Sequence, residues 1–416
     1  MRILHTSDWH LGRNIATFDL SNAQADAVQF IVDEAIKRKV DVFIIAGDVY
    51  DQGRPAVAEI NLLNKALTRL NNAGITVIVT AGNHDEAERL AANSNLMKDN
   101  VHIWGAIEDS GKSIVLQDEH GPVAFYPLTY LKPFASREIF NERGAAIEKA
   151  SHQEVVAQAM SFVREDLNRL VSENGSDVRS VVIAHAFVTT HGAKAEDEAS
   201  QEGQLDGVTR SESERDLSVG GIQNAASDLF EGISYVALGH IHGPQKVKAK
   251  SPKTAIRYSG SLLKYSLSEA NHKKSFVILQ LGSNSTVSDE DIELVSIPQP
   301  RGMARLVGDV DKLTGGQFAA NKNDFVDVIV TDAKYSESLQ SKIRNYFPFM
   351  MSFAHKPARG EAGTSVSEDI RGRQLSEIDI IKGFFSKVTG ADLSKIELEV
   401  VQSAIEEVNA GMDEDK

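Results

Sequence analysis

Side chains of the kinds that bind metal ions recur at five places along the chain, each directly after a short apolar run. In chain order they are Asp8 and His10, Asp48, Asn83 with His84 and Asp85, His185, and His240 with His242. Residues two apart in an extended segment point to the same side, so the Asp-x-His and His-x-His pairs each offer two donors together. Carboxylate and amide oxygens combined with imidazole nitrogens suit a six-coordinate divalent cation such as Mn²⁺.

The number of donors predicts a site for two cations. Two such ions need about seven or eight protein ligands with one carboxylate shared, and together they polarise a phosphate and activate water. Asp48 is expected to be the shared ligand because it follows a central strand. Asn83 supplies a neutral oxygen, which limits the negative charge that faces an anionic substrate. His84 follows this ligand, and we expect it to face the substrate and protonate the leaving oxygen.

Each motif has a simpler explanation when it is taken alone. A single histidine at the end of a strand is more often a hydrogen-bonded surface or core residue than a ligand. An aspartate after glycine, as in Gly47-Asp48, is common in turns. Coincidence would nevertheless have to place every cluster at one edge of a sheet, and this favours the metal site.

The elements that must position these residues alternate between strands and helices over residues 1 to about 105. Strands are expected in the opening apolar run that stops at Asp8 and at 40–46 and 75–80, and helices at 23–39 and about 56–70. Strands with little polar alternation, separated by helices, indicate a sheet covered by helices. In open α/β sheets, sites are built at the carboxyl ends of the strands, which is where the first three motifs fall.

The remaining chain predicts a longer helix at about 145–171, followed by strands at 180–184 and 235–238 that end at His185 and His240. Strands at 256–261 and 275–279 then complete the first domain. The expected organisation is a site-bearing domain at 1–282, a small α+β domain at 283–356, a linker at 357–374 and C-terminal helices at 375–416. Apolar residues recur at helical spacing in this last segment.

Composition restricts the class of protein. The chain has 416 residues, of which 42% are hydrophobic and 25% charged, enough for two or three domains. No run approaches the ~18 apolar residues of a membrane span, so no membrane partner is expected. Cysteine is absent, which excludes disulfides, thiolate metal sites and cysteine nucleophiles. Without a signal-peptide pattern, these features predict a cytoplasmic protein.

The net charge of −15 counts against a protein that coats nucleic acid through bulk charge. One local exception follows the last motif. The densest basic stretch of the chain contains Lys246, Lys248, Lys250, Lys253, Arg257, Lys264, Lys273 and Lys274. We expect Lys246, Lys248, Lys250 and Arg257 to contact DNA phosphates in a salt-dependent way, the alternative being the solvated face of a hairpin.

The order of the motifs resembles that of the calcineurin-like metallophosphoesterases. It runs from Asp8-x-His10 through Gly47-Asp48-Val49-x-Asp51, Gly82-Asn83-His84-Asp85 and Ala184-His185 to Gly239-His240-Ile241-His242. The resemblance implies an α/β fold, a β-sandwich flanked by helices, with a small α+β capping domain that contacts DNA and C-terminal helices that dock on a partner.

The same resemblance implies a ligand set and cofactors. One metal would be held by Asp8, His10, Asp48 and His242, and a second by Asp48, Asn83, His185 and His240. His84 would be the catalytic histidine. The implied cofactors are two Mn²⁺ ions, with Mg²⁺ as the alternative.

Residues that flank the first and last motifs narrow the resemblance to one branch of the family. Leu4-His5-Thr6-Ser7, Leu11-Gly12 and Ala237-Leu238 are similar to those of bacterial DNA nucleases that work with an SMC-type ATPase. This implies a manganese-dependent double-strand exonuclease and hairpin or single-strand endonuclease, acting in DNA repair, recombination and replication. DNA, the ATPase and a second copy of the chain are the implied partners. The chain has no P-loop motif, so ATP would be used by the ATPase.

Two other functions stay open from the sequence. A stand-alone phosphatase or small-nucleotide phosphodiesterase would use the same metal site, but the roughly 130 residues after position 280 favour a macromolecular substrate. A non-enzymatic scaffold would gain nothing from a complete ligand set. The C-terminal helices could also pack on their own domain instead of on a partner.

Overall fold

The computed structural model describes residues 1–97, 100–175, 177–190, 204–205, 208–211, 224–332, 334 and 336–357, together with Lys382 and Leu398. The chain divides into two units, Met1–Thr331 with Tyr335–His355, and Asp332–Lys334 with Lys356–Lys416. Almost all of the second unit lies outside the described residues. The linker and the C-terminal helices that we expected from the sequence fall there.

The first sheet has six strands in the order β16-β15-β1-β2-β3-β4. Its parallel strands are β1 (Arg2–Thr6), β2 (Val42–Ala46), β3 (Thr76–Thr80) and β4 (Val101–Trp104). The antiparallel strands β15 (Ser275–Gln280) and β16 (Ile292–Ser296) complete it. β16 lies beyond residue 282, where we expected the first domain to end, and it is nevertheless hydrogen-bonded into this sheet.

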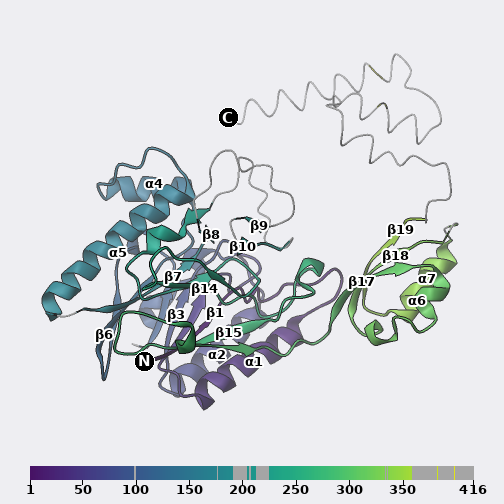
Figure 1. Cartoon of the computed structure of the whole chain (residues 1–416), viewed down its shortest axis with the longest axis horizontal. Coiled ribbons are helices and arrows are strands. Elements are labelled where there is room, and N and C mark those ends of the chain that lie inside the picture. The colour runs from purple at the N-terminus through teal and green to yellow at the C-terminus, as the bar shows by residue number, and fades with distance from the viewer. Residues whose placement is uncertain are drawn as a thin grey trace. The chain divides into compact units, whose positions relative to one another are not determined.

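Helices α1 (Ser21–Lys37) and α2 (Val57–Asn72) cover the outer face of the first sheet (Figure 1). Their buried residues, such as Ile31 and Leu67, pack with Leu4, Phe43 and Val77 from the strands. Side chains alternate along β1, so Leu4 faces these helices while Ile3 faces the opposite way. Both faces of β2 are buried, which explains why its sequence is apolar throughout.

The second sheet also has six strands, in the order β13-β14-β12-β7-β6-β5. They are β5 (Ile114–Asp118), β6 (Gly121–Pro127), β7 (Arg179–His185), β12 (Tyr235–Gly239), β13 (Gln245–Val247) and β14 (Ala255–Tyr258). The four central strands are parallel and the two edge pairs antiparallel. Short strands lie between β7 and β12 in the chain: β8 (Val188–Thr189), β9 (Gln204–Leu205), β10 (Val208–Thr209) and β11 (Ala225–Ala226). The short helix α3 (Ala87–Leu90) lies between β3 and β4 of the first sheet.

The two sheets pack face to face. Ile3, Ile44 and Ile78 from the first sheet share one buried cluster with residues of the second, including Phe125 and Ile183. Helices α4 (Pro133–Glu142) and α5 (His152–Asn174) cover the outer face of the second sheet. This confirms the α/β sandwich flanked by helices that we expected from the sequence.

One predicted helix begins later in the structure than we expected from the sequence. We expected a helix at about 145–171, but α5 begins only at His152 and a separate α4 precedes it. The Ser151 hydroxyl accepts a hydrogen bond from the main-chain N–H of Glu154 and caps α5 at its start. Between the helices, the Asn141 side chain pairs with both main-chain polar groups of Ile147 and holds this connection outside a helix.

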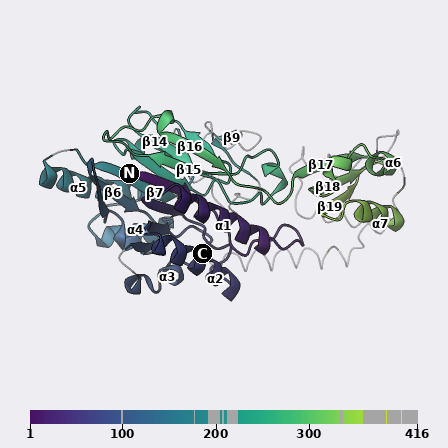
Figure 2. The ribbon, with the colours of Figure 1, turned by 90° about the horizontal axis from the view of Figure 1, so that it is seen from below.

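A third, smaller sheet contains three parallel strands, β17 (Met303–Gly308), β18 (Phe325–Val330) and β19 (Met350–His355). Helices α6 (Val310–Thr314) and α7 (Glu337–Tyr346) pack with these strands (Figure 2). The core between them contains Leu306, Val328, Ile343 and Phe347. These elements lie within the segment 283–356, for which the sequence predicted a small α+β domain. In the described part of the chain, no helix is long and apolar enough to cross a membrane.

Candidate metal centre

The predicted ligands lie at or just after the carboxyl ends of β1, β2, β3, β7 and β12. Two glycines let strands of the two sheets meet there. A Cβ on Gly239 would lie 1.8 Å from the main-chain oxygen of Ala46, and one on Gly47 would lie 2.2 Å from Nδ1 of His185. Only glycine permits these approaches, which bring the ligands of both sheets into one place.

The backbone is strained at several of these positions. Asp8, His10, Asp48 and His240 have φ of 51°, 44°, 47° and 96°, in the left-handed region that side chains rarely adopt. They are four of the six such non-glycine residues in the described part of the chain. Each costs about 1–3 kcal/mol, and such strain gathers at functional sites. The packing of the two sheets holds these residues in place.

The first donor group consists of Asp8, His10, Asp48 and His242, all of them buried. Nε2 of His10 lies 3.1 Å from Nε2 of His242 and 3.5 Å from Oδ2 of Asp48. Asp8, His10 and His242 each offer a ligand atom, and these atoms lie within 4.8 Å of one another. The structure therefore brings this predicted set together.

The second donor group consists of Asp48, Asn83, His185 and His240. Oδ1 of Asn83 lies 3.0 Å from Nε2 of His185 and 3.1 Å from Nδ1 of His240. Nε2 of His185 lies 3.2 Å from Oδ2 of Asp48. One oxygen of Asp48 therefore reaches a histidine of each group. Carboxylate oxygens, an amide oxygen and ring nitrogens that converge in this way fit divalent cations.

The charges of the two groups depend on one another. Burial alone would raise the pKa of Asp48, but His185, His10 and His84 hold it well below its usual range. Burial would lower the pKa of His185, yet the adjacent Asp48 outweighs it and raises this pKa to about 9. Burial and the neighbouring His185 hold the pKa of His240 well below its usual range. A cation would replace the proton of His185 as the charge that balances Asp48.

His84 lies beside both groups and is held from two sides. Its main-chain N–H donates to Oδ1 of Asp48 at 2.9 Å, and its ring Nδ1 lies 3.0 Å from the main-chain oxygen of Asp51. A carbonyl oxygen only accepts hydrogen bonds, so Nδ1 carries a hydrogen and Nε2 is the atom that can exchange a proton. A ligand atom of His84 also lies within 4.8 Å of those of His10 and Asp48. The geometry thus allows a ligand role for His84 as well as the catalytic role that we expected from the sequence.

Residues 1–244 match the family model described as calcineurin-like phosphoesterase. The chain belongs to this family. It is an enzyme that hydrolyses phosphate esters with divalent metal ions, as we expected from the sequence.

Other comparisons agree with this assignment. The D component of nuclease SbcCD from Staphylococcus saprophyticus is 27% identical over 398 residues, which cover 95% of this chain and 95% of that protein. A solved structure from Thermus thermophilus aligns with a TM-score of 0.39 and 13% identity, over 71% of this chain and 99% of that one. A dimetal phosphatase from Danio rerio aligns with a TM-score of 0.38 and 11% identity, over 71% of this chain and 99% of that one. These two TM-scores are too low to add to the argument.

Two aspartates of this phosphoesterase hold the motif loops, although the ligand sets expected from the sequence include neither of them. The buried carboxylate of Asp85 accepts hydrogen bonds from the main-chain N–H groups of Val49, Tyr50 and Gly82. Burial and the nearby charge of Asp48 raise the pKa of Asp85 to about 6. Asp51 places Oδ1 3.2 Å from Nδ1 of His10. Their position inside the motifs was the signal that could have identified them.

The basic stretch contains both residues at the surface and a buried lysine. Lys246, on β13, is half-exposed and pairs with Asp289 at 2.8 Å, while Lys248 and Lys250 are exposed. Arg257, on β14, lies opposite Lys246 in the register of this edge hairpin. DNA binding by these residues stays a prediction. Lys274 differs, because it is buried and therefore does not contribute to a surface patch.

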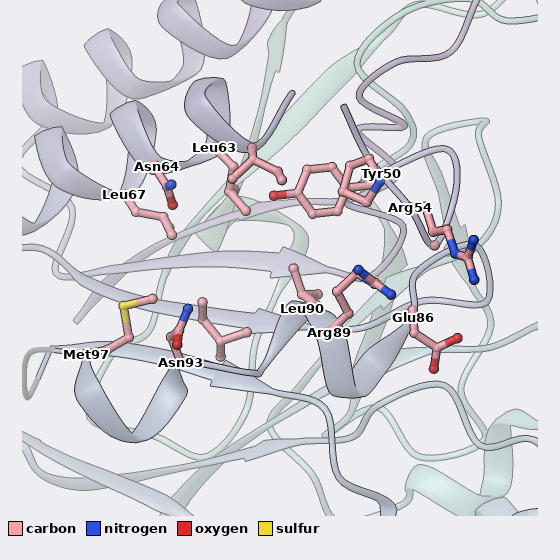
Figure 3. Close-up of a pocket in the computed structure, with 14 residues that line it drawn as sticks. Tyr50, Arg54, Leu63, Asn64, Leu67, Glu86, Arg89, Leu90, Asn93 and Met97 are labelled. Atoms are coloured by element: carbon pink, nitrogen blue, oxygen red, sulfur yellow. The ribbon is translucent and has the colours of Figure 1, made fainter. Parts of the chain in front are cut away.

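A pocket of about 490 Å³ lies between α2 and α3 (Figure 3). Arg54, Arg89 and Glu86 lie toward one end of it, and Leu67 and Met97 lie at the other. None of the predicted metal ligands lines it. The pocket is therefore separate from the two donor groups.

Proposed function

We propose that this phosphoesterase is a manganese-dependent DNA nuclease, the nuclease subunit of an SbcCD-like complex with an SbcC-like, SMC-type ATPase. The observation that carries the proposal is the pair of donor groups joined by Asp48. The similarity to a component of a nuclease over 95% of both chains supports DNA as the substrate, because it extends beyond the phosphoesterase region.

In this proposal the two donor groups hold two cations. Asp8, His10, Asp48 and His242 would hold one, and Asp48, Asn83, His185 and His240 the other. When bound, such ions polarise a phosphate and lower the pKa of water, which makes hydrolysis possible at neutral pH. Mn²⁺ fits the mixture of oxygen and imidazole donors, and Mg²⁺ is the alternative.

The protein's own residues orient the substrate and move protons. His84 is held by the main-chain oxygen of Asp51, which leaves Nε2 to donate a proton to the leaving 3′-oxygen. The neutral amide of Asn83 would bind a cation without adding negative charge, so the site repels the phosphate of the substrate less than a further carboxylate would. The other ligands are almost fully buried, whereas Asn83 and His84 are partly exposed, and in this proposal the substrate meets the centre beside these two residues.

The wider role that we propose is cleavage of duplex ends, and of hairpins and single strands, in DNA repair, recombination and replication in the cytoplasm. Lys246, Lys248, Lys250 and Arg257 would contact DNA phosphates. The small α+β unit, which we expected at 283–356 and which begins only after β16, would cap the site. Residues 375–416 would dock on the ATPase, and the nuclease subunit would act as a homodimer.

The variant His84→Gln tests the proposal. We expect it to bind Mn²⁺ like the wild type, because the donor groups remain, and to cleave labelled hairpin duplex at least about 100-fold more slowly. Full cleavage by the variant would contradict the assignment of His84. Hydrolysis of a small ester such as bis-p-nitrophenyl phosphate without cleavage of any DNA, with or without the ATPase, would instead indicate a small-molecule phosphodiesterase.

A further inference from the structure

A buried ion pair lies directly behind His242. Glu269 ends the short 3-10 turn Leu267–Glu269, Lys274 immediately precedes β15, and neither side chain is exposed to solvent. Nζ of Lys274 lies 2.5 Å from Oε2 of Glu269, and Oε1 of Glu269 lies 3.3 Å from Nδ1 of His242. Nε2 of His242 faces the other way, toward His10. The carboxylate therefore contacts the ring on the side opposite the first donor group.

The ammonium group of Lys274 donates three hydrogen bonds around His242. It donates to Glu269, to the main-chain oxygen of His242 at 2.8 Å and to Oγ of Ser261 at 2.8 Å. Glu269 also accepts a hydrogen bond from the main-chain N–H of Tyr265. The ion pair thus holds both the ring and the backbone of His242.

Stability alone gives a poor reason for this arrangement. Burying two charges costs desolvation free energy that their attraction often fails to repay, and an apolar pair of similar volume commonly stabilises a protein as well or better. A carboxylate behind a metal-binding histidine has a second use. It accepts the hydrogen of one ring nitrogen, fixes the tautomer and orientation of the ring, and makes the other nitrogen a stronger donor.

The histidines of the two donor groups differ in this respect. Nδ1 of His10 lies near the carboxylate of Asp51, and Nδ1 of His242 lies near that of Glu269. Nδ1 of His185, in the second group, lies 3.0 Å from the main-chain oxygen of Ala46, which is uncharged. A carboxylate hydrogen-bonded to the ring is therefore found behind His242, whereas the contact of Asp51 with His10 has only the distance of an ion pair.

We propose that Glu269, with its charge balanced by Lys274, is a positioning residue that holds the Nδ1–H tautomer of His242 and strengthens the first donor group as a divalent-cation site. Neither residue belongs to the five motifs. The inference rests on the proposed function, because it needs a cation at Asp8, His10, Asp48 and His242.

The test compares two double variants of the full chain, Glu269→Leu/Lys274→Met and Glu269→Gln/Lys274→Met. Both remove the two buried charges together, so neither leaves one charge unpaired. Only the second keeps a hydrogen-bond acceptor behind His242. Mn²⁺ binding is measured by calorimetry, and unfolding by circular dichroism without Mn²⁺. The control is Asp118→Leu/Arg179→Met, which removes another ion pair whose arginine is buried, together with the contact of Asp118 with the N-terminal ammonium group. This pair contacts none of the ligands.

We expect the leucine variant to lose about 10–100-fold in affinity for one of two Mn²⁺ ions, with the glutamine variant recovering part of the loss and the control unchanged. Unchanged affinity for both ions in a folded leucine variant would overturn the inference. Equal losses in both variants would also contradict the role of the hydrogen bond. If the wild type binds fewer than two Mn²⁺ ions, the proposed function fails instead, which separates the two outcomes.

Discussion

The closest approach of the two sheets supplies the sharpest structural prediction. A Cβ on Gly239 would lie 1.8 Å from the main-chain oxygen of Ala46 and 2.8 Å from Nδ1 of His185, whereas real Cβ contacts essentially never fall below 3.0 Å. The variant Gly239→Ala must therefore push β12 and β2 apart by about 1.2 Å. Neither strand can move easily, because Ile44 and Ala237 are packed in the cluster between the sheets.

We expect Gly239→Ala to lower the free energy of unfolding by about 3 kcal/mol, the upper part of the range for overpacked cores. For a unit of this size, with an entropy of unfolding of about 2.1 cal/mol/K per residue, that loss lowers the melting temperature by roughly 4–5 °C. Mn²⁺ affinity should fall as well, because the displaced strands carry Asp48 and His240. Thermal unfolding by circular dichroism and Mn²⁺ titration by calorimetry measure the two effects.

Gly282→Ala is the matched control, because a Cβ there meets no atom within 4 Å. It should leave the melting temperature and Mn²⁺ affinity unchanged. A Gly239→Ala variant that melts within about 2 °C of the wild type and binds Mn²⁺ equally well would refute this reasoning.

Two further predictions concern aspartates outside the ligand set. Asp85→Asn should lower the free energy of unfolding, measured by urea titration, by about 1–3 kcal/mol, and it should weaken Mn²⁺ binding. The reason is that an amide cannot accept hydrogen bonds from all three N–H groups that surround this carboxylate. An unchanged free energy of unfolding and unchanged Mn²⁺ affinity would contradict the role of Asp85 in holding the loops. Asp118 accepts a hydrogen bond from the buried Arg179 at 3.0 Å, and this arginine holds the pKa of Asp118 below its usual range. A lowered pKa stabilises the fold above the unfolded value of about 4, and the stabilisation is lost as the pH falls further. Asp118→Asn should therefore lower the free energy of unfolding by about 3 kcal/mol at pH 7, and by less at pH 3. An equal loss at both pH values would show that the charge of Asp118 is not the cause of the stabilisation.

The metal centre could be predicted from the sequence because its signals are local. Each ligand follows an apolar strand within a few residues, so the pattern shows both the strand and the edge at which it ends. Asp48 comes directly after β2 and its glycine, and His185 is the last residue of β7. The expectation that every cluster lies at one edge of one sheet was wrong, because β7 and β12 belong to the second sheet. Their ligands meet those of the first sheet through the close glycine contacts between the sheets, which no local pattern shows.

The residues that support the site were harder to predict because their roles depend on distant contacts. Lys274 follows another lysine and looks like part of a surface stretch, but its partners include Ser261 and the backbone of His242. β16 follows a turn-rich segment, and only its pairing with β15 shows that it belongs to the first sheet. Contacts between residues that are far apart in the chain produce no periodic pattern in the sequence.

The central claim is that Asp48 joins two cation sites, and anomalous X-ray diffraction from crystals grown with Mn²⁺ tests it most directly. We predict two manganese peaks, roughly 3.5–4 Å apart, with the Asp48 carboxylate bound to both. A single peak, or two peaks of which only one contacts Asp48, would contradict the account.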